Sequence, residues 1–187
     1  MIKIVQPIRD RLEIKKMQNE LLKKGMRDYM FFTIGITCGL RISDILNLKV
    51  KDVKNKTHIS LIEKKTQKPK RFELHPELQK DIVRYIQNMR DEDFLFKSRK
   101  GNSQISRVQA YRILNSTAKR IGIEEIGSHS LRKTFGFWHY TLYKDVATLQ
   151  DIFNHNSPST TLRYIGITED KKNETIVGVG NLFYEKD

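Results

Sequence analysis

Apolar residues near the start of the chain follow two helical patterns. From Pro7 to Lys24 they recur at helical spacing, which predicts an amphipathic helix that Gly25 ends. From Arg27 to Cys38 they are nearly continuous, which predicts a second helix with little exposed surface. Gly39 ends this helix, and Ser43 is expected to cap the short helix that follows.

Between Thr57 and Leu74 the pattern changes from helical to extended. Residues 58–62, HISLI, predict one strand, and residues 71–74, RFEL, predict the returning strand of a hairpin. Pro69 lies in the turn predicted between them. This hairpin is the one sheet that the sequence predicts.

The rest of the chain returns to helical spacing, with Pro76 and Ser106 expected at the starts of the first two helices. All these elements together predict a mainly α fold with a small antiparallel β-sheet (α+β), in a single domain covering residues 1–187. The last helix is expected to stop where Gly178 and Gly180 interrupt the pattern. The helices predicted here cover residues 77–89, 106–121, 128 or 130 to 143, 146–153, 159–164 and 168–177.

The net positive charge of the chain indicates what it binds. The formal net charge is +13, and it is concentrated in two windows. Lys49 to Arg71 holds nine lysines or arginines and two acids, and Lys97 to Arg120 holds seven and no acid. Such concentration predicts nucleic acid binding, because neutralised phosphates release counterions. A solvated basic surface is the plainer alternative, and an acidic membrane is disfavoured because no basic amphipathic helix with a bulky apolar face stands out.

Composition also limits the compartment and the cofactors. Cys38 is the only cysteine and lies in an apolar run, so a buried, unreactive thiol is expected. The longest apolar stretch, Tyr29 to Leu40, is too short to span a bilayer, and the first residues lack the apolar run of a signal peptide. These features predict a cytoplasmic protein. The five histidines lack metal-ligand spacing, so neither a metal nor another cofactor is expected.

Two short motifs carry arginines suited to a phosphate. Arg41 emerges where Gly39 ends the buried helix, and Asp44 can brace it from the same helical face. His129 and Arg132 have the i, i+3 spacing that places both on one face of a helix, where histidine can transfer a proton. Taken alone, Arg41 and Asp44 are better explained as a solvated surface pair, and His129 and Arg132 are a weak signal that a capping histidine and a solvated arginine also explain.

The segment 153–164 is the most specific one. His155 lies in a turn after a helix, and Tyr164 follows near the end of the next short helix, beside Arg163 and outside any apolar stripe. A tyrosine hydroxyl has a pKa near 10, so attack at neutral pH requires a nearby base and positive charge. Lys65 lies at the hairpin tip, where Lys64 and Lys68 are equally plausible by chemistry alone.

Together these segments resemble the tyrosine recombinase (phage integrase) family, from about residue 10 to the end. The family patterns G-L-R-x-S-E-L-x-x-L, K-T-x-K, H-x-L-R-H-T-F and L-G-H-x-x-x-x-T-x-x-Y match residues 39–48, 65–68, 129–135 and 153–164, the last with one extra residue of spacing. Asp44 replaces a glutamate, Lys133 a histidine and Asn154 a glycine. Asparagine tolerates a left-handed backbone, so the turn before His155 is expected to survive.

The resemblance implies a site-specific recombinase of a phage or mobile element, which cuts and rejoins double-stranded DNA. Tyr164 would form a 3′-phosphotyrosyl bond, Arg41 and Arg132 would hold the phosphate oxygens, and Lys65 would protonate the leaving 5′-oxygen.

The same resemblance gives roles to the histidines and to surface cations. His129 and His155 would move protons or hydrogen-bond the phosphate, and Asp44 would support Arg41. The residues expected to contact DNA are Lys64, Lys68, Arg107, Arg112 and Lys133.

The resemblance also has consequences for assembly. An N-terminal DNA-clamping domain is expected to be absent, and the tail 168–187 would pack on a neighbouring protomer. A homotetramer on paired DNA sites follows, with a monomer in isolation, in the cytoplasm and associated with the nucleoid. The alternatives are a type IB topoisomerase, a non-catalytic DNA-binding regulator and, least favoured, an RNA-binding protein. A covalent adduct with a nicked duplex would exclude the regulator, and plasmid relaxation without paired sites would favour the topoisomerase.

Overall fold

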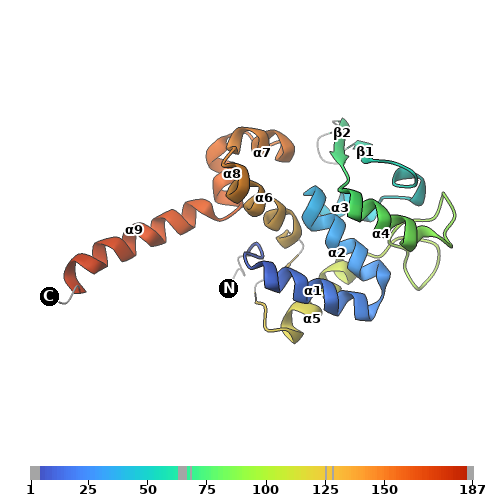
Figure 1. Ribbon diagram of the computed structural model, residues 1–187, viewed down its shortest axis with the longest axis horizontal. Coiled ribbons are helices and arrows are strands. Elements are labelled where there is room, and N and C mark those ends of the chain that lie inside the picture. The colour runs from blue at the N-terminus through green and yellow to red at the C-terminus, as the bar shows by residue number, and fades with distance from the viewer. Residues whose placement is uncertain (1–4, 63–66, 68, 125, 128, 185–187) are drawn as a thin grey trace. The chain divides into compact units, whose positions relative to one another are not determined.

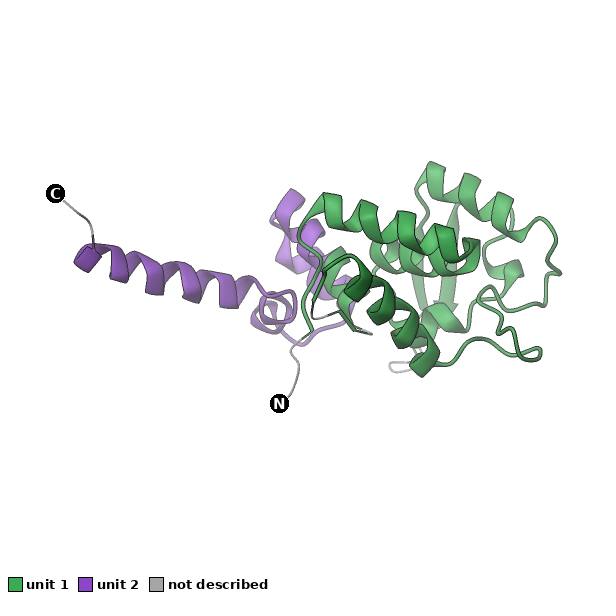
Figure 2. Cartoon of the chain, turned by 90° about the horizontal axis from the view of Figure 1, so that it is seen from below, with its two compact units in different colours: residues 1–135 green, residues 136–187 purple. Residues whose placement is uncertain are grey.

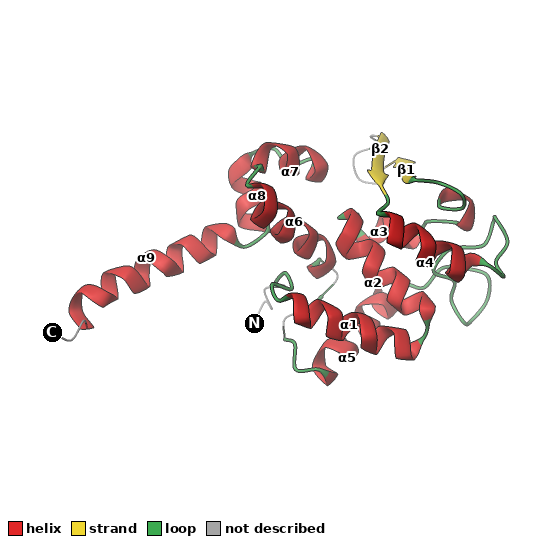
Figure 3. Cartoon of the chain, viewed as in Figure 1, coloured by secondary structure: helices red, strands yellow, loops and turns green. Residues whose placement is uncertain are grey.

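The computed structural model describes residues 5–62, 67, 69–124, 126–127 and 129–184 (Figure 1). The chain forms two compact units, residues 1–135 (unit 1) and residues 136–187 (unit 2), and the division falls within α6 (Figure 2). Helices dominate both units, and the described sheet has two strands (Figure 3). The helical elements and strands are α1 (Arg11–Lys24), α2 (Met26–Cys38), α3 (Ile42–Leu46), the 3₁₀ turn η1 (Val50–Asp52), β1 (His58–Ile62), β2 (Pro69–Glu73), α4 (Pro76–Ile86), α5 (Arg107–Arg120), α6 (Ser130–Tyr143), α7 (Val146–Phe153), α8 (Pro158–Tyr164) and α9 (Ile167–Tyr184).

Helix α2 is the centre of unit 1. It packs against α1, α3 and α4, and α1 in turn packs against α5. Phe31 and Phe32 of α2 are fully buried, and the ring of Phe31 meets the edge of Phe96 with centroids 5.6 Å apart. Burial of one such ring stabilises the fold by about 1.5–3 kcal/mol. The end of α2, at Gly39, is therefore a fixed point from which the following turn projects.

Helix α1 begins later than the sequence pattern predicts. The Asp10 carboxylate accepts a hydrogen bond from the Leu12 amide at 2.7 Å, and this cap starts the helix at Arg11 instead of Pro7. Ile8 lies before the cap, 1% exposed, and its amide donates to the Thr134 hydroxyl at 2.8 Å. The segment that was expected to be helical is thus an extended strap against the start of α6.

Strands β1 and β2 pair antiparallel, with a register running from His58 opposite Glu73 to Ile62 opposite Pro69. The hairpin prediction is confirmed, but β2 begins at Pro69, which was expected in the turn. Proline is tolerated at the first residue of an edge strand because no ladder donor is required there. Residues 63–66 and 68, with Lys64, Lys65 and Lys68, lie outside the described residues.

Several helix boundaries confirm local sequence signals, and one does not. Pro76 begins α4, and the Ser106 hydroxyl caps α5 by accepting from the Gln109 amide at 3.1 Å. Ser43 does not cap α3, because the backbone already turns helical at Ile42 and Arg41 occupies the capping position. The helix that carries Arg41 at its start is therefore two residues longer at that end than predicted.

Unit 2 has a small core and one long exposed helix. Leu149, Phe153 and Ile165 are fully buried, and a Cβ on Gly136 would collide with the last two, so α6 lies close to them. Helix α9 continues through Gly178 and Gly180, where the sequence pattern predicted an end, and buries no residue (Figure 1). Both glycines keep negative φ, and a glycine weakens a helix by about 0.5–1 kcal/mol without ending it. In the described part of the chain no helix has the length and apolar character required to cross a membrane.

Candidate active site

Arg132 is tied to the turn that carries Arg41. It lies in the first turn of α6, is only 4% exposed, and donates from Nη1 to the carbonyl oxygen of Gly39 at 2.5 Å. Gly39 has φ 62°, and a Cβ there would collide with the ring of Phe135. Glycine is thus required at this position twice over, by backbone conformation and by packing. Arg41 and Arg132, which are far apart in the sequence, therefore lie near each other in unit 1.

Asp44 belongs to the interior of the same turn. It is 5% exposed, and its Oδ2 is enclosed, as is Nη1 of the half-buried Arg41. The interpretation of Arg41 and Asp44 as a solvated surface pair is therefore wrong. A carboxylate is buried at a tolerable cost only when cations or donors surround it, so Asp44 is suited to supporting the arginines.

His129 lies just before α6, exposed at the surface and surrounded by cations. Partial desolvation of the ring lowers its pKa, and the positive charges of Lys133, Arg132 and Arg107 lower it further. The ring is consequently neutral at pH 7 and able to accept a proton.

Arg107, the first residue of α5, links His129 to the turn that holds Arg41. It lines a groove of about 320 Å³ together with Ser43 and Asn47, and Gln104 closes the groove by donating to Asn47 Oδ1 at 3.2 Å. The starts of α3, α5 and α6 therefore meet in one positively charged region of unit 1.

Lys133 has a structural contact where a DNA contact was predicted. Its ammonium donates to the Val5 carbonyl at 2.6 Å, and burial together with the charge of Arg9 lowers its pKa. The side chain of Val5 packs against Gly127, where a Cβ would collide with it. Lys133 thus fastens the N-terminal strap beside His129, and its contact with DNA stays a prediction.

His155 and Tyr164 lie together in unit 2. Asn154 has φ 53°, which confirms the left-handed turn predicted before His155. The His155 and Tyr164 rings have centroids 5.2 Å apart at 76°, and both rings meet the edge or face of the buried Phe153. Tyr164 is half-buried, so it is neither a core residue nor a free surface side chain.

Two polar residues hold His155 in this place. The Gln150 carbonyl accepts from the His155 amide at 3.0 Å, and the Gln150 side chain donates to the His155 carbonyl at 3.1 Å. The ring Nδ1 lies 3.1 Å from Oγ1 of the fully buried Thr161. Sequence reasoning missed both residues, although Thr161 is the threonine of the matched T-x-x-Y pattern.

Unit 1 thus brings together Arg41, His129 and Arg132, with Arg107 beside them, and unit 2 brings together His155 and Tyr164. Residues 10–171 match the model of the phage integrase family. The chain belongs to the phage integrase family of tyrosine recombinases. The mainly helical fold with its small antiparallel sheet is that of the catalytic domains of these recombinases.

Individual relatives agree with this assignment. The chain is 51% identical over 167 residues to the probable integrase/recombinase YoeC of Bacillus subtilis strain 168, covering 89% of this chain and 92% of that protein. It is 28% identical over 155 residues to tyrosine recombinase XerC of Staphylococcus epidermidis RP62A, covering 80% of this chain. Only 52% of XerC is covered, so the chain spans about half of that relative.

Solved structures of the family share the fold. The crystal structure of XerA recombinase aligns with a TM-score of 0.74 at 21% identity, over 100% of this chain and 66% of that one. XerH site-specific recombinase bound to its difH substrate aligns with a TM-score of 0.70 at 20% identity, over 88% of this chain and 52% of that one.

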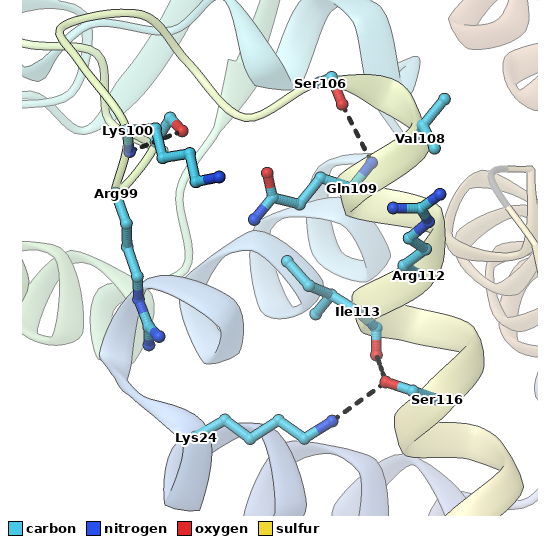
Figure 4. Close-up of a pocket in the computed structure, with 10 residues that line it drawn as sticks. Lys24, Arg99, Lys100, Ser106, Val108, Gln109, Arg112, Ile113 and Ser116 are labelled. Carbon is cyan, nitrogen blue, oxygen red and sulfur yellow. Dashed lines mark hydrogen bonds between the residues drawn. The ribbon is translucent and has the colours of Figure 1, made fainter.

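The positive charge of this integrase-family chain is distributed differently from what residue counting predicts. In the first window, Lys49 and Lys51 each pair with Glu92 at 2.8 Å, and Lys54 pairs with Asp91 at 2.7 Å. In the second window, neither Arg99 nor Arg112 forms an ion pair with any described residue; these two and Lys100 line a cavity beside α5 (Figure 4). Lys97 and Arg120 of the same window do pair, with Asp93 at 3.5 Å and with Glu20 at 3.6 Å, so the cations beside this cavity are the ones available to a polyanion.

No described cluster of three or more histidine, cysteine or acidic side chains could hold a metal ion. Cys38 is 3% exposed, and burial raises the pKa of its thiol to about 11. The thiol therefore stays protonated at neutral pH, which confirms the prediction of an unreactive, buried cysteine.

Proposed function

We propose that this chain cuts and rejoins double-stranded DNA through a covalent 3′-phosphotyrosyl intermediate. The Tyr164 oxygen attacks the scissile phosphorus as the bond to the 5′-oxygen breaks, and the new phosphodiester keeps the energy needed for rejoining. Return attack by a 5′-hydroxyl of a partner strand releases Tyr164 and completes strand exchange. No nucleotide hydrolysis is needed, because the number of phosphodiester bonds is unchanged.

Each candidate residue has a role in this scheme. Arg41 and Arg132 hold the non-bridging oxygens and stabilise the negative charge that grows on them in the transition state. Lys65 protonates the leaving 5′-oxygen. His129 and His155 move protons and hydrogen-bond the phosphate.

One observation carries the proposal: the buried Arg132 guanidinium is bonded to the Gly39 carbonyl, two residues before Arg41. Two guanidiniums fixed at one turn form a preorganised phosphate site, which surface arginines do not. The half-buried Tyr164 beside His155 supports the second half of the scheme.

The test uses a nicked duplex from which a short 5′-hydroxyl strand diffuses away after cleavage, which traps the adduct. We expect a covalent adduct that withstands heat and detergent, and its complete loss in Tyr164→Phe, because phenylalanine keeps the ring contacts and lacks the nucleophile. Tyr111→Phe is a matched control, since Tyr111 is exposed on α5. Absence of any adduct across ionic strengths would contradict the proposal and favour a DNA-binding regulator.

We also propose assembly on DNA through α9. Leu182, Phe183 and Tyr184 are 76%, 77% and 85% exposed at its end, an apolar tip without a partner segment in the described chain. Packing of this tip on a second copy would give the tetramer on paired sites predicted from the resemblance. Relaxation of a supercoiled plasmid that lacks paired sites would instead favour a topoisomerase-like activity.

A further inference from the structure

A second basic site lies on α5, outside the residues that the proposed chemistry uses. A cavity of about 580 Å³ is bordered by the end of α1, the loop that follows Lys97, and α5 (Figure 4). Lys24, Arg99, Lys100 and Arg112 line it, and no acidic side chain is among the described residues that do. Four cations around one concavity repel one another, which is relieved when an anion enters.

The cations of this cavity lack the pairing seen elsewhere in the chain. Arg99, Lys100 and Arg112 make no ion pair with a described residue, whereas Lys49, Lys51 and Lys54 all do. Lys24 is held by the Thr117 hydroxyl at 2.6 Å and the Ser116 hydroxyl at 3.3 Å. Burial and the charge of Arg120 lower the pKa of Lys24, and the carboxylates of Asp28 and Glu20 act in the opposite direction with smaller effect.

The lining also offers hydrogen-bond donors suited to phosphate oxygens. Figure 4 shows the side chains of Lys100 and Gln109 turned toward each other across the cavity, with Lys24 at its other end.

Arg107 is on the same helix α5 as Arg112, five residues away, which is about 7.5 Å along the axis. Helix α5 thus connects the basic region around His129 with this cavity.

We propose that the cavity holds backbone phosphates of duplex DNA away from the phosphate that is cut. The identity of the ligand rests on the proposed function, because the site itself shows only a concave surface lined by cations and suited to an anion. Contacts of this kind position a protein on DNA without reading its sequence.

The experiment measures equilibrium binding of the full chain to a fluorescent duplex over a series of salt concentrations. Arg99→Gln and Lys100→Gln each remove one charge from an exposed loop, so neither is expected to affect folding. Each should weaken binding and reduce the magnitude of the log–log salt slope by about 0.9, the value for one phosphate contact. Arg84→Gln is the matched control, because Arg84 lies on α4, is exposed and does not line the cavity.

The outcomes separate this proposal from the proposed function. Salt slopes of Arg99→Gln and Lys100→Gln equal to that of Arg84→Gln would overturn the phosphate site. An equal loss of affinity for a scrambled duplex is the expected result, since backbone contacts carry no sequence information. Tyr164→Phe keeps every cation and should keep the parental slope, so a missing adduct leaves this measurement intact.

A separate observation in unit 2 assigns a role to Thr161. Its hydroxyl lies 3.2 Å from the Ser157 carbonyl and 3.1 Å from Nδ1 of His155. A carbonyl can only accept, so in the arrangement that keeps both contacts as hydrogen bonds the single hydroxyl proton of Thr161 is donated to Ser157. The proton between Oγ1 and Nδ1 must then come from the histidine, which places N–H at Nδ1.

The geometry points to Thr161 as a positioning residue that fixes the tautomer of His155. With Nδ1 protonated, Nε2 is the nitrogen left to meet the reacting atoms. It accepts a proton while the ring is neutral and donates to a phosphate oxygen once the ring is charged. Gln150 bonds to both the amide and the carbonyl of His155 and so holds this residue next to the buried Thr161.

The tautomer can be read from imidazole nitrogen spectra of protein labelled with ¹⁵N-histidine, with His155→Gln used to assign the signals. We expect proton attachment at Nδ1 in the parent and in Thr161→Ser, and a shift toward Nε2 attachment in Thr161→Val. The rate of adduct formation should fall in Thr161→Val and recover in Thr161→Ser. A parent spectrum with the proton on Nε2 would overturn this assignment, and it can be recorded whether or not an adduct forms.

Discussion

The two units hold their candidate chemistry in contrasting ways. In unit 1 Arg132 is 4% exposed and bonded to a backbone carbonyl. Asp44, three residues after Arg41 in the sequence, is also buried. In unit 2 Tyr164 is half-buried on a short helix and is placed by aromatic contacts with Phe153 and His155. A guanidinium can be buried because its five donors find acceptors in a rigid arrangement. A nucleophile must reach its substrate, so it is positioned by packing at an edge.

The largest expected effect comes from Arg132→Lys, which keeps the charge and removes the planar fork. The rate of adduct formation on a nicked duplex should fall by about 10²–10³-fold, because a point charge cannot bond Gly39 and two phosphate oxygens together. Arg163→Lys, beside Tyr164 and exposed, is the control and should change the rate by less than about threefold. Equal losses in both variants would show that unit 1 holds no special phosphate site.

A pair of glycine substitutions sharpens the contrast in stability. Gly39→Ala should lower the free energy of unfolding by about 2–4 kcal/mol, because the residue is left-handed and its Cβ would collide with Phe135. Gly178→Ala in α9 should raise it by about 0.5–1 kcal/mol, since nothing lies within 4 Å and the backbone is helical. Urea unfolding monitored by circular dichroism measures both, and a destabilising Gly178→Ala would contradict the exposed helix.

A smaller effect is expected on the titration of His129. Its lowered pKa means that the folded state binds the proton less tightly than the unfolded state, so this residue destabilises the fold as pH falls below about 6.5. Arg107→Gln should raise the pKa of His129 by removing one of three cations that lower it. Titration followed by NMR checks this, and Arg112→Gln should leave the value unchanged. A constant pKa in Arg107→Gln would place Arg107 away from His129.

The smallest effect on stability is expected in α9, where no side chain is buried. The double substitution Leu182→Ser and Phe183→Ser should change the free energy of unfolding of the isolated chain by less than about 0.5 kcal/mol. The same change should abolish the larger complexes on paired DNA sites that sedimentation would detect for the parent. Unaltered complexes would refute the role of α9 in assembly.

Much of the fold follows from signals between near neighbours in sequence. Helical spacing predicts α2, α5 and α7 within a residue or two, and Pro76 and Ser106 mark helix starts as expected. These predictions succeed because caps and amphipathic faces involve residues within one or two turns. Two of the errors, at Ser43 and in α9, have the same origin: a local signal for a cap or a break was present, but the backbone is helical at that position.

The sequence by itself determined which residues have the chemistry for the proposed reaction, through the motifs around Arg41, His129 and Tyr164. Only the tertiary structure decided how they are held: the Arg132–Gly39 bond joins residues 93 positions apart. It also decided that Lys49 and Lys51 share an ion pair with Glu92, while Arg99 and Arg112 pair with no described residue. The physical reason is that burial and pairing of a charge depend on which distant surfaces pack together, and no local pattern encodes that packing.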